Sequence, residues 1–263
     1  ADKPSGKPIK LAMLYAYSGQ VGDSGKKWEI LSRMAAAEIN AAGGVNGSPL
    51  DLVFYDSQGD PQQAVVQTRK AAADNNFAIL GAMLSNECQV AFPVANQLQV
   101  PMIAPGSALP GLGAQNRPWA FRLAATDEKT IQATIDAFKK LFPNAKKFAI
   151  IVYVKYAWSR GFGTGLLPSK LKENGYELVT GEGGISIQSG QTDYAAQITK
   201  LKGLKADAIG VAVMYTEAGP VGKEMKRQGI NLPVIGGTSI MLPSLIQTGG
   251  DAVEGWIASQ AFW

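Results

Sequence analysis

The fold is decided by a stretch that reads Phe77-Ala-Ile-Leu-Gly-Ala-Met-Leu-Ser85-Asn86, and by a second that reads Val100-Pro-Met-Ile-Ala-Pro-Gly106-Ser107-Ala108. In each, a short apolar run of strand length leads directly into small hydroxyl residues that can open a helix or a turn. In an open α/β sheet, ligands bind beyond the carboxyl ends of the strands. Hydroxyl groups and unpaired backbone N–H groups at two such ends can form an anion site without a charged side chain. The sequence therefore predicts a protein that holds a small carboxylate rather than one that transforms it.

Strand and helix patterns alternate on both sides of these stretches. In the first half, strands are expected at 9–16, 50–55, 77–80 and 102–104, with helices near 31–39, 61–72 and 85–98 between them. The alternation restarts after a turn-rich stretch at 109–118, with Thr126-Asp127-Glu128 expected to cap the next helix. There, strands are expected at 148–154, 177–180, 208–213 and 234–236, and helices at 161–174, 194–201, 217–228 and 242–248.

Strands that alternate with helices predict parallel, right-handed βαβ units. The expected fold class is α/β, with two Rossmann-like, doubly wound lobes joined near residues 119–123. The first ligand-binding lobe is placed at 1–121 and the second at 122–252. Residues 253–263 are expected to form a crossover strand that returns toward the first lobe.

Composition restricts the class of protein further. The chain has 263 residues, of which 46% are hydrophobic and 17% charged, as expected of a well-buried globular protein. Its apolar runs are too short to span a membrane. The net charge of +4 comes from dispersed lysines, without a basic stripe that carries aromatic residues, so no nucleic-acid partner is expected.

The chain lacks the residues that most enzymes use. Histidine is absent, which removes the commonest general base and metal ligand, and Cys88 is the only cysteine. Gly111-Leu-Gly113 has no third glycine for a dinucleotide fingerprint, and Gly161-Phe-Gly-Thr-Gly165 is not followed by Gly-Lys-Ser. We therefore expect no enzyme, no catalytic residue, no metal and no cofactor, although catalysis by carboxylates or lysine alone stays open.

Motifs along the whole chain resemble one family. They include Ala37-Glu-Ile-Asn-Ala-Ala-Gly-Gly-Val-Asn-Gly47, Tyr55-Asp-Ser57, the two serine turns and Gly249-Gly-Asp-Ala-Val-Glu-Gly255. In this order and spacing they resemble the type I periplasmic solute-binding proteins of the branched-chain amino-acid (Leu/Ile/Val-binding-like) ABC transporter family. The resemblance implies two lobes with several crossovers, which trap a ligand by hinge closure.

The resemblance also implies a setting and partners. We expect a monomer in the periplasm, or lipid-anchored outside a Gram-positive cell, that delivers its ligand to an ABC transporter permease at the inner membrane. The sequence starts with Ala1-Asp2-Lys3-Pro4, which we interpret as the start that remains after cleavage by signal peptidase. The alternative is a boundary that was chosen for expression. Family members usually continue past the equivalent of Trp263, so a C-terminal part is expected to be missing.

Carried over by motif, the resemblance implies that the first lobe binds the ligand carboxylate. Ser85, Asn86 and the Gly106-Ser107 turn are the expected binding residues, with a plain helix N-cap as the alternative for Ser85. Where relatives often have a further hydroxyl this chain has Ala108, so Ser107 or Asn86 is expected to replace that donor.

Other positions are expected around the ligand. Tyr17 and Ser24 should line the mouth of the cleft. Trp158 falls where relatives place an aromatic residue that closes over the ligand, with Tyr156 and Tyr153 as alternatives. Met214 and Tyr215 are candidate walls, for which a core or rim position is the competing interpretation. Arg122 is expected in a hinge salt bridge, with contact to an anion as the alternative.

Thr238 is the informative position for ligand charge. It matches the place where amino-acid-binding relatives have an acidic residue for the ligand ammonium group, and Thr238 or Ser239 can offer only a neutral hydrogen bond. The resemblance thus implies a carboxylate without an α-amino group, with an aromatic acid preferred. Glu217 could still supply the missing charge, so an amino acid or amide ligand stays open, as does a sensor or regulator of the same fold.

Overall fold

The computed structural model describes residues 3–109, 111–113, 117–241 and 243–258, and the chain divides into two compact units, Ala1–Ala124 and Ala125–Trp263. Each unit is described by itself. Among the helices described, none combines the length and the apolar composition that crossing a bilayer requires.

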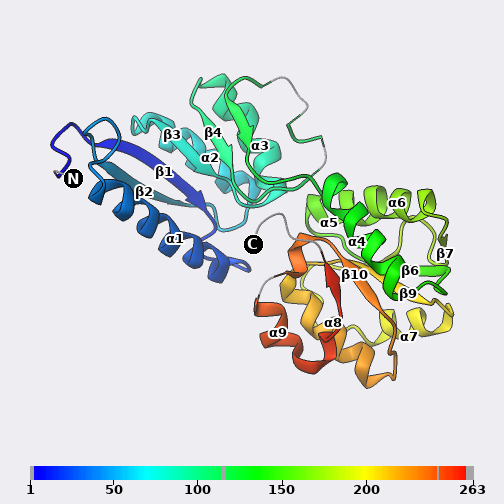
Figure 1. Cartoon of the computed structure of the whole chain (residues 1–263). Coiled ribbons are helices and arrows are strands. Elements are labelled where there is room, and N and C mark those ends of the chain that lie inside the picture. Colours follow the sequence, from blue (N-terminus) through cyan, green and yellow to red (C-terminus); the bar gives the residue numbers. More distant parts are fainter. Residues whose placement is uncertain (1–2, 110, 114–116, 242, 259–263) are drawn as a thin grey trace. The chain divides into compact units, whose positions relative to one another are not determined.

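The first unit is a parallel sheet with helices on both faces (Figure 1). Its strands are β1 (Ile9–Tyr15), β2 (Leu50–Asp56), β3 (Ala78–Gly81), β4 (Met102–Ala104) and β5 (Ala120–Arg122). Its helices are α1 (Gly22–Ala41), α2 (Pro61–Ala73) and α3 (Ser85–Gln97). The sheet order is β2-β1-β3-β4-β5, and all four strand pairs are parallel. The predicted βαβ pattern is confirmed.

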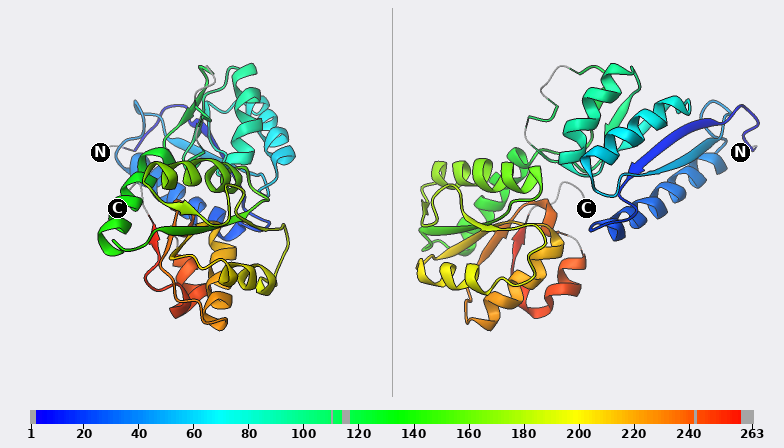
Figure 2. Two further views of the ribbon diagram at one scale, coloured as in Figure 1. Left: turned by 90° about the vertical axis from the view of Figure 1, so that its right-hand side faces the viewer. Right: turned by 180° about the vertical axis from the view of Figure 1, so that it is seen from behind.

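The reversal of strand order beside β1 puts the helices on opposite faces. Because βαβ crossovers are right-handed, α1 covers one face, and α2 and α3 pack together on the other (Figures 1 and 2). The core lies between the sheet and the α2–α3 pair and includes Leu14, Ile79, Phe92 and Met102, all at most 1% exposed. This packing fixes the carboxyl ends of β3 and β4, where the predicted anion site begins.

Local chemistry explains two of the helix starts. Asp60 caps α2 by accepting hydrogen bonds from the Gln62 and Gln63 amides, and Pro61 occupies the first turn, as the sequence predicted. At Gly25, in α1, an added Cβ would lie 1.9 Å from the Ala16 carbonyl oxygen. Glycine is therefore what allows α1 to begin directly over the end of β1.

The second unit is another parallel sheet covered on both faces. Its strands are β6 (Lys147–Tyr153), β7 (Glu177–Leu178), β8 (Ile185–Ile187), β9 (Ala208–Ala212), β10 (Val234–Gly236) and β11 (Ile257–Ala258). Its helices are α4 (Asp127–Leu141), α5 (Ala157–Gly161), α6 (Leu167–Glu173), α7 (Ala195–Gly203), α8 (Tyr215–Arg227) and α9 (Pro243–Gly249). A π-helical segment, Phe162–Leu166, joins α5 to α6, and short 3-10 turns cover Thr238–Ile240 and Gly250–Val253.

The strand order of the second sheet is β11-β10-β9-β6-β7, with β8 also paired to β6. Helices α4, α5 and α6 lie on one face, and α7, α8 and α9 on the other (Figure 1). The core is aromatic on the α4 side of β6, where Phe138, Phe148 and Tyr176 have ring centroids 4.8–6.0 Å apart.

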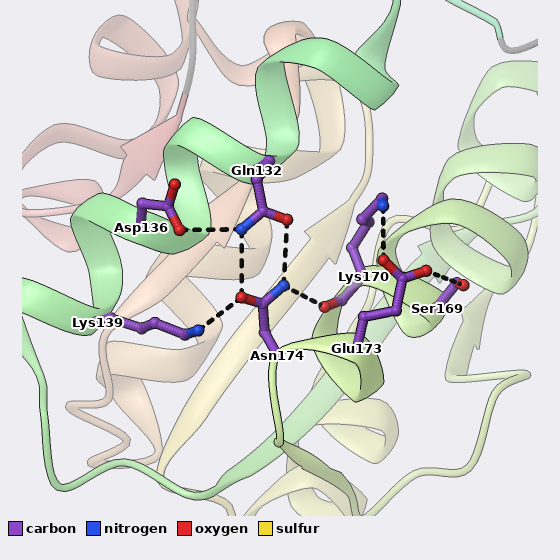
Figure 3. A network of polar contacts seen from close by, with 7 residues as sticks. All are labelled: Gln132, Asp136, Lys139, Ser169, Lys170, Glu173 and Asn174. Atoms are coloured by element: carbon purple, nitrogen blue, oxygen red, sulfur yellow. Dashed lines mark hydrogen bonds and ion pairs between the residues drawn. The ribbon is translucent and has the colours of Figure 1, made fainter.

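A polar cluster joins α4 to α6 on the outside of this core (Figure 3). Asn174, which ends α6, exchanges side-chain hydrogen bonds of 3.2 Å with Gln132 of α4 and accepts one of 2.6 Å from Lys139. Its amide nitrogen also donates to the Lys170 carbonyl oxygen. One side chain thus fixes two helices relative to each other.

The structure differs from the sequence-based expectations at several points. Strand β8 was not predicted, and the single helix expected at 161–174 is divided by the π-helical segment. Strand β5 belongs to the first sheet, so the first unit extends beyond residue 121. Within the segment 253–263, which was expected to form a crossover strand, Ile257–Ala258 pairs with β10 of the second sheet. This pairing satisfies the backbone groups along the outer edge of β10, and residues 259–263 lie outside the described part.

Candidate functional site

Two serine hydroxyls meet at the carboxyl ends of β3 and β4. Ser85 is the first residue of α3 and Ser107 follows β4, and their Oγ atoms are 2.8 Å apart. Both residues are buried, with exposed fractions of 5% and 1%. Because β3 and β4 pair in parallel, their ends lie side by side. The prediction that the two serine turns, one after β3 and one after β4, are neighbours is confirmed.

The interpretation of Ser85 as an N-cap is wrong. Leu84 occupies the N-cap position of α3, and Ser85 lies one residue inside the helix. A residue at that position has already entered the helix, so its hydroxyl does not cap the first-turn amides. It is directed instead to Ser107, which leaves the serine pair at the positive end of the α3 dipole.

Glu87 lies beside the serine pair and was missed by the sequence analysis. The residues at the ends of β3 and β4 (Ser85, Asn86, Glu87, Gly106 and Ser107) are called the first-unit corner below. The side chain of Glu87 is fully buried, and its Oε2 accepts a 3.0 Å hydrogen bond from the Leu84 amide. The pKa of Glu87 is raised to about 7, chiefly by burial and also by the nearby charges of Asp60 and Asp56, while the hydrogen bond from the Leu84 amide acts to lower it. A glutamate at the third helical position is the usual capping-box partner, which was a usable sequence signal.

Three further residues near the serine pair are Asn86, Gly106 and Cys88. Asn86 is half-buried, and its side-chain oxygen has no hydrogen-bond partner in the described part of the chain. A Cβ on Gly106 would approach only the Met83 carbonyl oxygen, at 3.6 Å, so space does not demand glycine there. The Cys88 thiol is buried and donates to the Ala82 carbonyl oxygen at 3.3 Å, and burial raises its pKa, so it is a poor nucleophile.

Tyr17 does not join the serine pair. Its ring packs edge-on against Phe54 with centroids 5.7 Å apart, and its hydroxyl donates to the Met13 carbonyl oxygen, back along β1. Burial, as the largest effect, raises the pKa of the Tyr17 hydroxyl. Ser24 is half-buried in the first turn of α1, beside the end of β1. The aromatic contacts of Tyr17 explain why it turns away from the strand ends.

Arg122 also differs from its predicted role. Its Nη1 atom donates a 2.8 Å hydrogen bond to the Leu109 carbonyl oxygen, within the first unit. Among the described residues no salt bridge of Arg122 is seen. The guanidinium therefore holds the loop that follows Ser107 close to β5.

In the second unit, as in the first, candidate residues follow two neighbouring strands. The residues at the ends of β9 and β10 (Met214, Tyr215 and Thr238) are called the second-unit corner below. Met214 is the N-cap of α8 and Tyr215 its first residue, at the end of β9. The turn after the neighbouring strand β10 begins with Thr238, and the Ser239 hydroxyl donates to the Val213 carbonyl oxygen at 2.7 Å. Tyr215 thus stands where Ser85 stands in the first unit. The strand ends bring Met214, Tyr215 and Thr238 into one region, as the sequence predicted.

Glu217 is the counterpart of Glu87. It lies at the third position of α8, is 5% exposed, and accepts a 2.8 Å hydrogen bond from the Thr216 hydroxyl. Burial raises its pKa, while hydrogen bonds from Thr216 and the Met214 backbone and the charge of Lys155 oppose the shift. Its carboxylate thus accepts hydrogen bonds from residues at the start of its own helix.

Trp158 is held firmly inside the second unit. Its indole N–H donates to Asp127 Oδ2 at 2.5 Å, and its ring stacks on Phe162 with centroids 5.1 Å apart and planes inclined by 10°. A Cβ on Gly237 would lie 2.8 Å from indole Cζ2. The indole therefore lies against the backbone just before Thr238. Asp127, which was predicted only as part of a helix start, is a further residue of this region.

Three tyrosines border the same strand ends. Tyr153 ends β6 and packs edge-on against Tyr156, with centroids 5.6 Å apart. Tyr194 lies close enough to Glu217 and Tyr153 for their charges to raise its pKa, in addition to the larger effect of burial. Like Trp158, all three are at most 7% exposed.

The strand ends of each unit, taken separately, have groups that suit a small ligand. No group of three or more histidine, cysteine, aspartate or glutamate side chains able to hold a metal ion is present in the described ranges. The first-unit corner offers neutral hydroxyls and a helix N-terminus, which suit an anion. The second-unit corner offers aromatic rings and the neutral hydroxyl of Thr238.

Comparison with known proteins agrees with this geometry. Residues 8–263 match the family described as periplasmic binding protein. The Leu/Ile/Val-binding protein of Citrobacter freundii is 27% identical over 97% of this chain and 68% of its own length. The chain thus spans about two thirds of that relative.

Solved structures share the fold. A leucine binding protein from Thermotoga maritima has a TM-score of 0.85 at 24% identity, covering 97% of this chain and 70% of its own. A solute binding protein of an ABC transporter from Rhodopseudomonas palustris, in complex with 3,4-dihydroxy benzoic acid, has a TM-score of 0.80 at 20% identity, covering 94% of this chain and 66% of its own. The chain belongs to the periplasmic binding protein family, as a type I member of its branched-chain amino-acid class.

Proposed function

We propose that this chain is the extracytoplasmic receptor of an ABC importer and captures a small carboxylate, with an aromatic acid as the preferred ligand. The observation that carries the proposal is the buried Ser85–Ser107 hydroxyl pair, with Oγ atoms 2.8 Å apart, at two adjacent strand ends. Hydrogen bonds from neutral donors to a carboxylate are charge-assisted and stronger than neutral ones. A carboxylate inserted between these hydroxyls would replace their mutual hydrogen bond with two stronger ones.

The nature of the second-unit corner supports a ligand without an ammonium group. Thr238 offers only a neutral hydroxyl, and Trp158 and Tyr215 lie in the same region. Burying an ammonium group there without a carboxylate partner would be costly. A flat apolar body fits these residues better, and the R. palustris protein shows that this fold can hold an aromatic acid.

An amino acid is the second candidate. Several relatives of this chain are Leu/Ile/Val-binding proteins, and Glu217 is a buried acid in the same region as Thr238. Because its carboxylate already accepts the Thr216 hydroxyl and a hydrogen bond from the Met214 backbone, we favour the aromatic acid. A sensor of the same fold would bind by the same chemistry, and only its partner would differ.

A ligand panel tests the proposal. Thermal shift and then calorimetry would compare benzoate, 4-hydroxybenzoate and phenylpropenoate with leucine, and benzamide would serve as the uncharged match of benzoate. We expect one of the acids to bind with a dissociation constant of micromolar order, roughly 8 kcal/mol, and to raise the melting temperature by mass action. Tight binding of leucine, with none of the acids bound, would contradict the aromatic-acid proposal.

A further inference from the structure

The indole of Trp158 is fixed by a carboxylate that lies far away in the sequence. Asp127 is the first residue of α4 and is fully buried, and its Oδ2 accepts the Trp158 indole N–H at 2.5 Å. A carboxylate at this position is favoured by the positive end of the α4 dipole. At this distance the contact is a short hydrogen bond. The ring orientation is therefore set by one strong, directional contact.

Two further contacts leave the ring little freedom to move. Phe162 stacks on the indole at 5.1 Å with nearly parallel planes, and the edge of the six-membered ring lies against Gly237. A Cβ at Gly237 would come within 2.8 Å of the indole, so any larger residue would displace the ring. The ring is thus restrained at its N–H, on a face and along an edge, beside Thr238.

Asp127 is itself held in place through α4. Gln132 and Lys139, farther along the same helix, bind Asn174 at the end of α6 (Figure 3). These hydrogen bonds fix α4 against the helix that follows Trp158 and Phe162 along the chain. The position of the Asp127 carboxylate is therefore determined by packing between helices and not by a loop.

We propose that Asp127 is a positioning residue for ligand selection: it turns the indole N–H of Trp158 inward and holds the ring as a flat wall beside Thr238. The proposal rests on the proposed function. With its N–H bonded to Asp127 and one face covered by Phe162, Trp158 is left with its opposite face as a π surface for the ligand and with no hydrogen-bond donor. The second unit then selects a planar, uncharged ring over a branched aliphatic body, because the latter cannot stack on that surface.

Substitutions at both ends of the contact test this inference. Asp127→Leu removes the acceptor, Asp127→Asn keeps a neutral one, and Trp158→Phe keeps an aromatic ring without the N–H. In ¹⁵N-labelled protein, the Trp158 indole signal is identified among those of the five tryptophans by its loss in Trp158→Phe. We expect a strongly downfield indole proton in the wild type, a large upfield shift in Asp127→Leu and a smaller one in Asp127→Asn.

Ligand affinity supplies the second measurement. We expect Asp127→Leu to weaken binding of the best aromatic acid by about tenfold, and Asp127→Asn by about threefold, in line with loss or weakening of one hydrogen bond. In the Trp158→Phe background, Asp127→Asn should change the affinity less than twofold. This double-mutant comparison keeps the inference testable if Asp127→Leu does not fold.

The outcomes separate the two proposals. Acid binding that is unaffected by Asp127→Leu overturns the inference, as does an indole signal that does not move. Equal effects of Asp127→Asn with and without Trp158 also overturn it, because Asp127 would then act independently of the indole. If the wild-type chain binds none of the acids, the proposed function fails, whatever the indole signal shows.

Discussion

At the scale of single residues, each of the two units has a buried glutamate in the first turn of a helix. Glu87 and Glu217 each lie at the third position of a helix that follows a buried strand, and both are at most 5% exposed. Burial raises the pKa of each carboxyl group. A carboxyl group with a raised pKa makes stability depend on pH near neutrality.

The pH dependence that Glu87 causes has a definite sign. Its pKa is about 7 in the folded chain and 4.5 in the reference state, so the folded chain holds the proton more tightly. The stabilising contribution is fully present below pH 4.5 and is lost as the pH rises through 7. We expect the free energy of unfolding to fall by up to about 3 kcal/mol over this range because of Glu87. Urea unfolding at pH 5.0, 6.5 and 8.0 would measure it.

Glu87→Gln should remove this part of the pH dependence. Glu173→Gln is the matched control, because Glu173 is an exposed glutamate whose pKa is lowered, mainly by the Lys170 hydrogen bond. A lowered pKa gives a contribution of opposite sign, which is lost as the pH falls. If Glu87→Gln and the wild type show the same pH dependence of stability, the role assigned to burial at Glu87 is contradicted.

At the scale of helices and strands, hydrophobic alternation and turn residues predicted most of the order of elements. Strand β8, Ile185–Ile187, was missed because it is short and gains its stability by pairing with β6, which is remote in sequence. The apolar period predicted helix α1 correctly, but it did not predict how far the helix is buried. Two of the apolar side chains that define this period, Leu31 and Met34, are 56% and 54% exposed. Capping was predicted correctly at Asp60 and incorrectly at Thr126, whose side chain makes no capping hydrogen bond.

This contrast between the two helix starts gives a prediction. Asp60→Ala should lower the free energy of unfolding by about 1 kcal/mol, the usual cost of removing an N-cap, because the Gln62 and Gln63 amides lose their acceptor. Thr126→Ala should change it by less than about 0.5 kcal/mol. Urea unfolding at pH 5 would compare the two variants. Equal losses at both positions would contradict the assignment of the caps.

At the scale of the whole chain, two units of similar plan each place candidate binding residues at the carboxyl ends of neighbouring strands. The rule that ligands bind at such ends led from the sequence to Ser85 and Ser107, whereas Thr238 was predicted from the family resemblance. Asp127 and Glu87 could not be assigned to the site this way, because their roles depend on contacts that form only when the helices pack. The side-chain direction of Tyr17 likewise follows from its packing against Phe54.

The measurement that tests the central claim most directly is the affinity of the Ser85→Ala/Ser107→Ala chain for the acid that the wild type binds best. Calorimetry should show a loss of about a hundredfold, because two hydrogen bonds to a charged group are removed. Ser169→Ala, which removes an exposed hydroxyl bonded to Glu173, is the control and should bind as the wild type does. Unchanged affinity in the double variant would contradict the claim that the serine pair binds the carboxylate.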